Sequence, residues 1–466
     1  DDFDAWIDRT LEQIGVAWVL SLVFLRTLED RGLLDHARLA GQGALDSEGV
    51  FFELFPSLGV GDYVYASFRE LSRLPGAREV FAPKHNPAWR LSPSGPVLRE
   101  LVAFFREAEP ASGEASEPRL VWRFDGSDTR FLGDLYQDVS ASVRERYALL
   151  QTPDFVEALI LDQTLTPAIA EYGLETVRVL DPTCGSGHFL LGAFRRLFEA
   201  RQRAFPASPA KTQAGEALGQ VYGTDINPYA VAIARFRLLL AYLEAAGLDR
   251  LGQAPELPAN LVVVDSLAYG AEGASLALDF GAEALESASP FAFRLDDAEG
   301  AKRVLGQRYH SVVGNPPYIT CKDPALRELY RKGYASAAGK FALAAPFTEA
   351  FFRYALDGAF VGLINANSFM KREFGKALVE QVLPQLELTR VVDTSGAYIP
   401  GHGTPTVLLF GRNRRPLSAT VRAVLGKRGE PSTPERPEEG LVWRSLRDHL
   451  DEVGFEKDYL SVAELP

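Results

Sequence analysis

The chain has 466 residues, of which 47% are hydrophobic and 24% charged, and its formal net charge is −13. This length allows about three domains of ordinary size, and the acidic balance excludes a general polyanion binder, so that nucleic acid would have to meet a local basic surface. Two cysteines, Cys184 and Cys321, and no Cys/His cluster at zinc-site spacing predict a cytoplasmic protein without a disulfide framework or a metal site.

Residues 1–118 are predicted to form a mainly helical domain. The longest apolar run near the start, residues 14–25, is too short to cross a bilayer and indicates a buried helix. Acidic residues replace the basic flank of a signal peptide, so no membrane association is expected. Residues 107–118 are acidic and rich in Pro, Gly and Ser, which is typical of a linker. Apolar side chains recur near helical spacing at Trp6, Ile7, Ile14, Trp18, Leu22 and Leu25.

From about residue 150 the pattern changes to apolar strands that alternate with helices, which predicts a parallel α/β sheet. We assign residues 119–415 to this second domain, with an insertion at about 268–304, and residues 416–466 to a linker and the start of a C-terminal region, with a hinge at 429–440. The predicted strands are 177–180, 221–223, 261–264, 311–313, 360–364, 390–392 and 407–410, and the predicted helices are 189–204, 229–246, 346–356 and 371–383.

The first of these strands runs into the segment DPTCGSGH, residues 181–188, before a helix begins. Glycines at a strand-to-helix turn let the backbone approach a ligand closely. The next strand ends in Asp225, at the position where an acidic residue holds a ribose diol, and the third ends in Asp265, which could accept a hydrogen bond from an adenine amino group. The three strand ends predict a nucleotide-like cofactor site. Each carboxylate has an alternative role, because Asp181 could cap a turn and the other two could cap the helices that follow.

Asn315-Pro316-Pro317-Tyr318 follows a buried apolar strand. The two prolines fix the backbone and remove two N–H donors. The Asn315 amide and nearby carbonyls can then accept hydrogen bonds from outside the chain, and Tyr318 adds a flat ring. This arrangement suits a planar substrate with an exocyclic amine, although a tight turn after a strand is the simpler alternative.

The order of these motifs carries a family resemblance. DPTCGSGHFLL, then TDINPYA, VVDSL and NPPY, resembles the amino-group DNA methyltransferases, and Thr152-Pro153 upstream of them resembles the gamma class of N6-adenine enzymes. The segments IPGHGTPT and GVAWVLSLVFLRTLEDRGLL are similar to PglX-type adenine methyltransferases of BREX bacteriophage-exclusion systems, or to a DISARM-type relative. Members of this family are usually much longer than this chain.

The resemblance implies a Rossmann-like sheet, S-adenosyl-L-methionine as cofactor, and adenine-N6 methylation of double-stranded DNA as a host mark within an anti-phage system that includes other defence proteins. Thr152 and Pro153 would border the methionine carboxylate. Asn315 and the Pro316 carbonyl would hold the target amine, with Tyr318 stacked on a flipped base and Pro317 completing the turn. The implied cofactor-binding residues are Thr152, Pro153, Asp181, Pro182, Cys184, Gly185, Gly187, Asp225, Ile226, Asp265 and Ser266; no metal is implied.

Several features stay open at this stage. A second stacking residue is expected within residues 398–402, where His402 could equally be a loop residue bonded to backbone. Tyr330 and Tyr334 are expected to pack in a core. Alternative functions are a cofactor-binding scaffold or sensor of a defence complex, and N-methylation of protein glutamine or RNA. A basic group that could track DNA phosphates or form a solvated helix face comprises Lys322, Arg331, Lys332, Lys340, Lys371 and Arg372.

Overall fold

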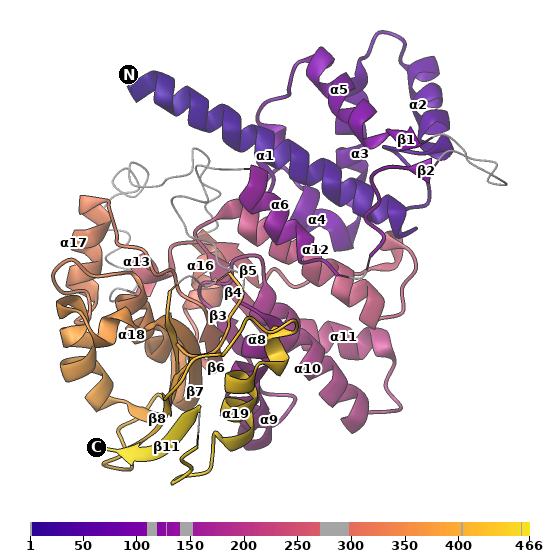
Figure 1. Cartoon of the computed structure of the whole chain (residues 1–466). Coiled ribbons are helices and arrows are strands. Elements are labelled where there is room, and N and C mark those ends of the chain that lie inside the picture. Colours follow the sequence, from indigo (N-terminus) through magenta and orange to yellow (C-terminus); the bar gives the residue numbers. More distant parts are fainter. Residues whose placement is uncertain are drawn as a thin grey trace.

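The computed structural model describes residues 2–109, 119–126, 128–139, 152–270, 298–401, 404–457 and 459–466. A nine-stranded mixed sheet carries helices on both faces, and a helical N-terminal region lies against one of them (Figure 1). The predicted α/β class, with a Rossmann-like sheet and a mainly helical N-terminal region, is confirmed.

The sheet has the strand order β11-β10-β8-β9-β7-β6-β3-β4-β5. Strands β5, β4, β3, β6 and β7 are parallel, β9 is antiparallel to its neighbours β7 and β8, and β11 is antiparallel to β10. The carboxyl ends of five adjacent strands therefore meet at one edge. The strands are β3 (Val179–Asp181), β4 (Val221–Asp225), β5 (Leu261–Val263), β6 (Tyr309–Gly314), β7 (Ala355–Ala366), β8 (Glu387–Asp393), β9 (Thr406–Arg412), β10 (Val421–Gly426) and β11 (Leu460–Leu465).

All seven predicted strands are confirmed, because continuous apolar runs suit strands that are covered on both faces. Every residue of β6 is buried. One face of the sheet is covered by α8 (Asp154–Gln163), α9 (Leu165–Tyr172), α10 (His188–Ala204), α11 (Ala210–Gly219) and α12 (Pro228–Ala245), and the other by α13 (Ser266–Gly270), α16 (Ala298–Leu305), α17 (Pro324–Gly333) and α18 (Ala344–Tyr354).

Two predicted helices differ from the structure. The helix expected at 346–356 ends at Tyr354, and Ala355 already begins β7. The helix expected at 371–383 is present as a continuous helical stretch over residues 373–385, but it is irregular, with 3₁₀ turns at Glu373–Gly375 and Leu383–Gln385 on either side of a π turn at Leu378–Val382. A side chain at Gly375 would overlap the backbone of Phe369, so the start of this segment lies close against the preceding turn.

The N-terminal region consists of α1 (Asp2–Asp30), α2 (Gln42–Leu54), α3 (Val60–Arg73), α4 (Arg78–Phe81), α5 (Gly95–Phe105), a hairpin of β1 (Ala108–Glu109) and β2 (Arg119–Leu120), and α6 (Phe131–Val139). The predicted buried helix at residues 14–25 lies within α1, where Trp18 is fully buried. The stretch Trp6–Asp30 is long and apolar enough to cross a membrane by length and composition, yet 78% of its most apolar window is buried inside the protein.

Contacts between α1 and α12 join the N-terminal region to the sheet (Figure 1). The rings of Phe24 and Phe236 stack at 4.2 Å, and the Tyr229 hydroxyl donates to the Gln13 carbonyl at 2.9 Å. Apolar side chains of both helices belong to one continuous core. Helix α12 is therefore covered by the sheet on one side and by α1 on the other.

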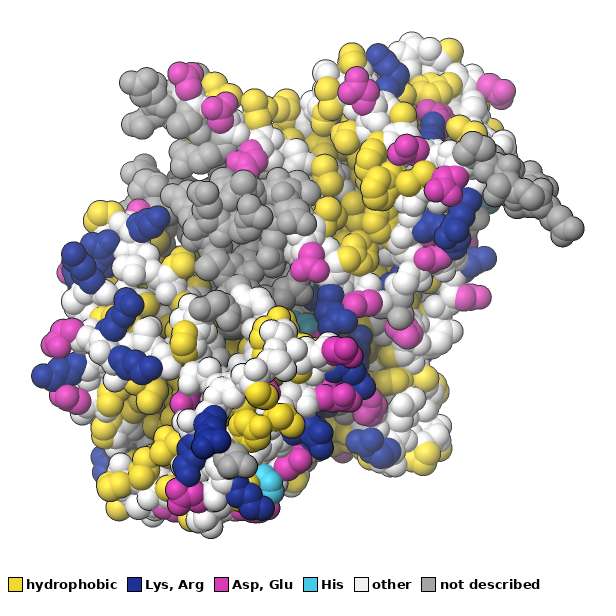
Figure 2. Space-filling view, viewed as in Figure 1, with side chains coloured by type: hydrophobic (Ala, Val, Ile, Leu, Met, Phe, Trp, Pro, Cys, Tyr) yellow, Lys and Arg dark blue, Asp and Glu magenta, His cyan; other side chains and the backbone are white. Residues whose placement is uncertain are grey.

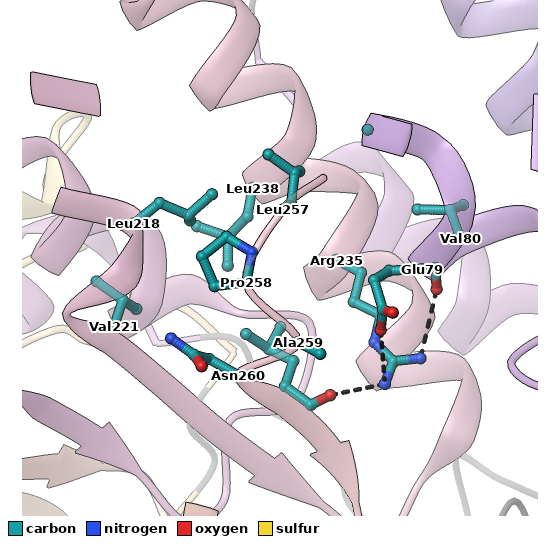
Figure 3. A pocket seen from close by; sticks show the side chains of 12 residues that line it. Glu79, Val80, Leu218, Val221, Arg235, Leu238, Leu257, Pro258, Ala259 and Asn260 are labelled. Carbon is teal, nitrogen blue, oxygen red and sulfur yellow. Dashed lines mark hydrogen bonds and ion pairs between the residues drawn. The ribbon is translucent and has the colours of Figure 1, made fainter. Parts of the chain in front are cut away.

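A pocket lies where α12 meets α4 (Figure 3). Within it, Arg235 lies 3.7 Å from the Glu79 carboxylate and donates to the Leu261 carbonyl at 2.6 Å. Its lining includes Val221 and Leu261, the first residues of β4 and β5. The pocket is therefore at the amino edge of the sheet, opposite the predicted cofactor site.

Residues 416–466 join the same sheet through β10 and β11, with α19 (Leu441–His449) between them. Trp443 packs edge-to-face on Phe155 of α8 at 4.7 Å. Within the predicted hinge, the Glu430 carboxylate accepts from the Val442 N–H at 2.7 Å and so caps α19. Residues 110–118 of the predicted linker and 271–297 of the predicted insertion lie outside the described residues, and the three-part domain division stays a prediction.

Candidate active site at the carboxyl edge of the sheet

The NPPY turn lies directly beside the first carboxylate of the predicted cofactor site. Strand β6 pairs with β3, so Gly314 at the end of β6 comes next to Asp181 at the end of β3. A Cβ atom at Gly314 would lie only 2.5 Å from Asp181 Oδ1. This close approach requires a glycine at this position and puts Asn315 next to the cofactor edge.

The turn between β3 and α10, residues 182–187, which we call the glycine turn, is tied to the end of β4 by two hydrogen bonds from its backbone N–H groups. The Gly185 N–H donates to Asp225 Oδ2 at 2.9 Å, and the Cys184 N–H donates to the Thr224 carbonyl at 2.9 Å. Gly185 has a φ of 51°, which favours glycine, and a side chain there would meet nothing within 4 Å. The turn therefore presents bare backbone to open space, which suits a ligand held by main-chain groups.

Gly187 serves a different purpose at the end of the same turn. Its φ is 84°, and a Cβ atom there would lie 2.8 Å from the Cβ of Ala234 in α12. Helix α10 begins at the next residue. Gly187 thus allows α10 to start in close contact with α12, and its predicted contact with a cofactor stays a prediction.

Asp225 is held by the backbone on both oxygens, since its Oδ1 accepts from the Asn227 N–H at 2.8 Å. The cap of α12 is Asn227, whose Oδ1 accepts from the N–H groups of Tyr229 and Ala230. The helix-capping role that was open for Asp225 therefore belongs to Asn227. A carboxylate has about four acceptor positions, so Asp225 keeps capacity for a diol beside the half-buried Ile226.

Asp265 does cap the helix that follows it. Its Oδ1 accepts from the Ala268 N–H at 2.9 Å, while Oδ2 accepts from the Tyr330 hydroxyl at 2.5 Å. The neighbouring Ser266 hydroxyl donates to the Pro182 carbonyl at 2.8 Å. The structure therefore brings together the predicted residues Pro182, Asp265 and Ser266 from the ends of β3 and β5.

Asn315 is oriented by the other predicted upstream motif. Its Nδ2 donates to the Thr152 hydroxyl at 3.2 Å, and Thr152 is buried just ahead of α8, whose cap is Pro153. No described residue donates a hydrogen bond to Asn315 Oδ1, so this oxygen can accept one from a ligand. Pro316 is buried, whereas Pro317 and Tyr318 are half-buried at the edge of the same site.

Burial changes the protonation of the carboxyl groups here. It raises the pKa of Asp181 to about 8, against the hydrogen bonds from Thr183, and the nearby Asp225 adds to the rise. Burial also raises the pKa of Asp225 and of the Tyr318 hydroxyl. Among the described residues, no cationic side chain is one of the groups that shift the pKa of Asp181 or Asp225. Two buried carboxyl groups of this kind favour a ligand that carries a cationic group.

Sequence reasoning missed the groups that hold the glycine turn from its helix side. Arg237 of α12 donates to the Ser186 carbonyl, and His188 Nε2 lies 2.9 Å from Asp154 Oδ1. The Arg130 guanidinium in turn holds the second oxygen of Asp154 at 3.1 Å. The sequence does show Arg237 inside the apolar stretch of α12, but this pattern does not reveal which group the arginine contacts.

Three further predicted groups remain. Tyr330 and Tyr334 are buried in the core under α17, which confirms their packing role. His402 lies outside the described residues, while Tyr398 of the same loop is exposed. All six residues of the predicted basic group are exposed, and Lys and Arg side chains gather on the face around α17 (Figure 2).

Comparison with known proteins agrees with this geometry. Along 99% of its length the chain is 42% identical to the adenine-specific methyltransferase PglX of Streptomyces coelicolor. The chain is related to PglX. Residues 219–399 also match the family described as Eco57I restriction-modification methylase. The predicted resemblance to PglX-type adenine methyltransferases is confirmed, and the chain spans 40% of the length of this relative.

Solved structures show the same fold at low sequence identity. The DrdV–DNA complex matches 99% of this chain and 45% of its own with a TM-score of 0.55 and 14% identity. The type IIL restriction-modification enzyme MmeI in complex with DNA matches 97% of this chain and 63% of its own with a TM-score of 0.51 and 14% identity. The sheet and the helical N-terminal region are thus both covered by these matches.

Proposed function

We propose that this chain is the catalytic part of a DNA methyltransferase that transfers a methyl group from S-adenosylmethionine to the N6 amino group of adenine. The observation that carries the proposal is that Asn315 Oδ1 receives no hydrogen bond from the described residues. Asn315 follows Gly314, whose close contact with Asp181 puts it beside the cofactor edge. The 42% identity to PglX, whose name specifies adenine, supports this choice of base.

The residues at the strand ends fit S-adenosylmethionine. Open space at Gly185 admits a ligand against the backbone, and the buried Asp181 carboxyl suits an ammonium group. We assign the methionyl end to Thr152, Pro153, Asp181 and the glycine turn, including Cys184 and Gly187, the ribose to Asp225 and Ile226, and the adenine to Asp265, Ser266 and Pro182. When bound, the cofactor supplies an electrophilic methyl group on a sulfonium centre.

The chain's own contribution to the reaction is positioning and electrostatics. The adenine amine is a weak nucleophile because its lone pair is delocalised into the ring. If it donates to Asn315 Oδ1 and the Pro316 carbonyl, the nitrogen becomes more tetrahedral and its lone pair points away from these acceptors. The Thr152 hydroxyl fixes the Asn315 amide in the orientation that presents Oδ1. Fixed dipoles of this kind need no rearrangement during the reaction.

A base inside a duplex must be rotated out before it can reach this edge, at a cost of a few kcal/mol. The half-buried Tyr318 ring would stack on the extruded base and offset part of that cost. The exposed basic residues around α17 would contact phosphates, which gives an acidic protein a local surface for DNA. We propose a cytoplasmic role as the host-marking methyltransferase of a phage-defence system, together with the other proteins of that system.

Methyl incorporation from labelled S-adenosylmethionine tests the function. The 466-residue chain should label a mixture of duplex DNAs that contain adenine in many contexts, and should not label duplexes in which N6-methyladenine replaces adenine. Asn315→Ala should remove the labelling while leaving cofactor affinity, measured by calorimetry, within about twofold, because Asn315 contacts the target base rather than the cofactor.

Two results would contradict the proposal. Labelling of RNA or of protein glutamine in place of DNA would move the chain to another substrate class. Tight cofactor binding with no methyl transfer to any of these, even with the other proteins of the defence system present, would make it a sensor.

A further inference from the structure

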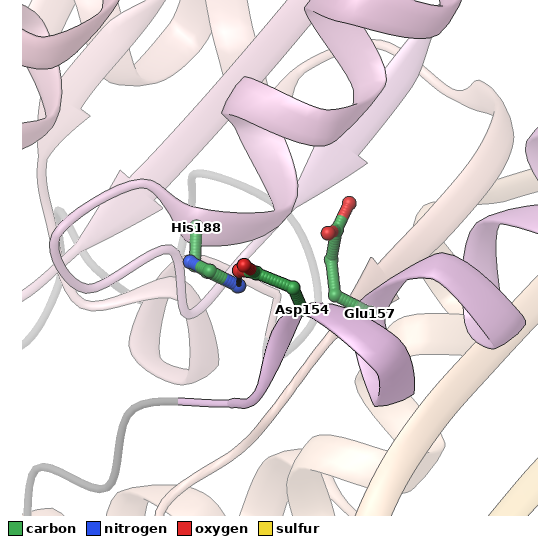
Figure 4. Close-up of side chains that lie close together, drawn as sticks. All are labelled: Asp154, Glu157 and His188. Carbon is green, nitrogen blue, oxygen red and sulfur yellow. Dashed lines mark ion pairs between the residues drawn. The ribbon is translucent and has the colours of Figure 1, made fainter. Parts of the chain in front are cut away.

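A cluster of three metal-binding residue types lies beside the glycine turn, outside the groups assigned above (Figure 4). Asp154 is the first residue of α8, Glu157 follows one turn later on the same helix, and His188 is the first residue of α10. One potential ligand atom of each lies within 4.8 Å of the other two. His188 Nε2 and Asp154 Oδ1 are 2.9 Å apart.

Glu157 is the unusual member of the cluster. It is only 8% exposed, and its carboxylate makes no hydrogen bond within the described part of the chain. It lies against Gly192 of α10, where any side chain would overlap its Oε1. A buried carboxylate without a partner is costly, and metal coordination is one of the few ways to compensate for it.

The imidazole of His188 points to the same conclusion. Its side chain is 13% exposed, and Nδ1 is buried with no hydrogen-bond partner among the described residues. Buried side-chain nitrogens usually have a hydrogen-bond partner, so Nδ1 has unused capacity. Here both the histidine and the buried glutamate have unused capacity at one place.

Arginine side chains surround the cluster, and burial raises the pKa of Glu157 overall although the charges of Arg196 and Arg195 lower it. Arg130 holds Asp154 Oδ2 at 3.1 Å, which leaves Oδ1 turned toward His188. Arg196 pairs with the exposed Asp162 and also donates to the Ala158 carbonyl at 2.9 Å. The groups that could supply ligand atoms at this place are two carboxylates and one imidazole.

We propose that Asp154, Glu157 and His188 form a binding site for a divalent transition-metal ion that joins the first turns of α8 and α10. One nitrogen and two oxygen donors suit Zn²⁺, Mn²⁺ or Co²⁺ better than Mg²⁺, which prefers oxygen ligands and keeps several waters. Three protein ligands leave further positions for water. No metal was expected from the sequence, because His188 lies on a different helix from Asp154 and Glu157 and no Cys/His pair has zinc-site spacing. The site does not depend on the proposed methyl transfer.

Cobalt binding to the tag-free chain, after removal of metals with a chelator, tests the site directly. Co²⁺ should bind one ion per chain, give visible d–d absorption bands, raise the melting temperature, and be displaced by Zn²⁺. Glu157→Gln and His188→Asn should each weaken the binding by at least the roughly tenfold that loss of a supporting group costs at metal sites.

The matched control is Glu199→Gln, which removes an exposed carboxylate on α10, the helix that carries His188, and should leave cobalt binding unchanged. Glu157→Gln should be at least as stable as the unchanged chain in the presence of chelator, because a neutral amide replaces an unpaired buried carboxyl. No saturable cobalt binding, or equal binding by folded Glu157→Gln and His188→Asn variants, would overturn the proposal.

Discussion

The guanidinium of Arg237 donates to the Ser186 carbonyl at 2.8 Å and to the Ser186 hydroxyl at 3.3 Å. From its other side, Nε donates to the Thr129 hydroxyl at 3.0 Å. Arg237 is only 3% exposed, and burial lowers its pKa to about 10, so it stays charged at neutral pH. Arg237 therefore joins the segment ahead of α6 to the middle of the glycine turn.

Replacing this residue should loosen the turn. We expect Arg237→Gln to weaken S-adenosylmethionine binding about tenfold or more, since hydrogen bonds from a charged group contribute about 1.5–3 kcal/mol. Calorimetric titration of the cofactor measures the loss. The control is Arg203→Gln on α10, which removes a solvent-exposed arginine and should bind the cofactor normally. Equal affinities in the two variants would show that Arg237 does not hold the turn in its binding shape.

The contact between Gly314 and Asp181 gives a second test. Gly314→Ala would force a Cβ atom to within 2.5 Å of Asp181 Oδ1, so strands β3 and β6 would have to separate at their ends. Overpacking of this kind costs about 1–3 kcal/mol. Methyl transfer should be lost and the free energy of unfolding in urea should fall. Gly219→Ala, where a side chain meets nothing within 4 Å, is the control and should keep both properties. Full activity in Gly314→Ala would contradict the close packing.

Asp181 should make stability depend on pH. Its carboxyl has a pKa of about 8 in the folded chain and an ordinary value of 3.8, so between these values the folded chain binds a proton that the unfolded chain has lost. The free energy of unfolding should therefore fall as pH rises through this window, by up to about 1.4 kcal/mol per pH unit from this group.

Asp181→Asn keeps an oxygen for the Thr183 N–H and cannot ionise. Its melting temperature, measured in chelator from pH 5 to 8, should fall less steeply than that of the unchanged chain. The curve should not become flat, because burial also raises the pKa of Glu157 to about 8, with the same sign. If the melting temperatures of the two proteins fell equally with pH, the pKa of Asp181 would not be raised and another group would cause the pH dependence.

The strand ends of this site could be predicted from sequence, whereas the contacts behind them could not. Asp181, Asp225 and Asp265 each follow a short apolar strand, and parallel strands bring such positions to one edge whatever the details of packing. The motif order placed Asn315 and Thr152 in one site, and the hydrogen bond between them agrees with that. Local pattern is sufficient here because the backbone alone determines where a strand ends.

Side chains that meet through helix packing leave no such pattern. The pairing of Asp154 with His188 depends on how α8 docks against α10, and the role of Arg237 depends on a loop more than a hundred residues earlier in the chain. Nor does sequence distinguish the two oxygens of Asp265, of which one caps α13 and the other meets Tyr330. These contacts are set by tertiary packing, which overrides local preference.

The short hydrogen bond from Tyr330 to Asp265 leads to the last prediction. At 2.5 Å it fixes one carboxylate oxygen, and the buried ring of Tyr330 cannot turn away to solvent. If Asp265 receives the cofactor's adenine amine, Tyr330 orients the acceptor without touching the cofactor. Tyr330→Phe and Asp265→Asn should each weaken S-adenosylmethionine binding, and the double variant should lose less than the sum, with a coupling of about 0.5–3 kcal/mol.

Tyr334→Phe is the matched control, because it also removes a buried hydroxyl, one that donates to the Leu267 carbonyl at 3.0 Å. It should lower stability to a similar extent as Tyr330→Phe while leaving cofactor affinity and the effect of Asp265→Asn unchanged. Additive losses in the Tyr330 and Asp265 pair would mean that the two residues act separately. In that case Asp265 would serve only to cap α13, and the adenine of the cofactor would be recognised by other groups at the end of β5.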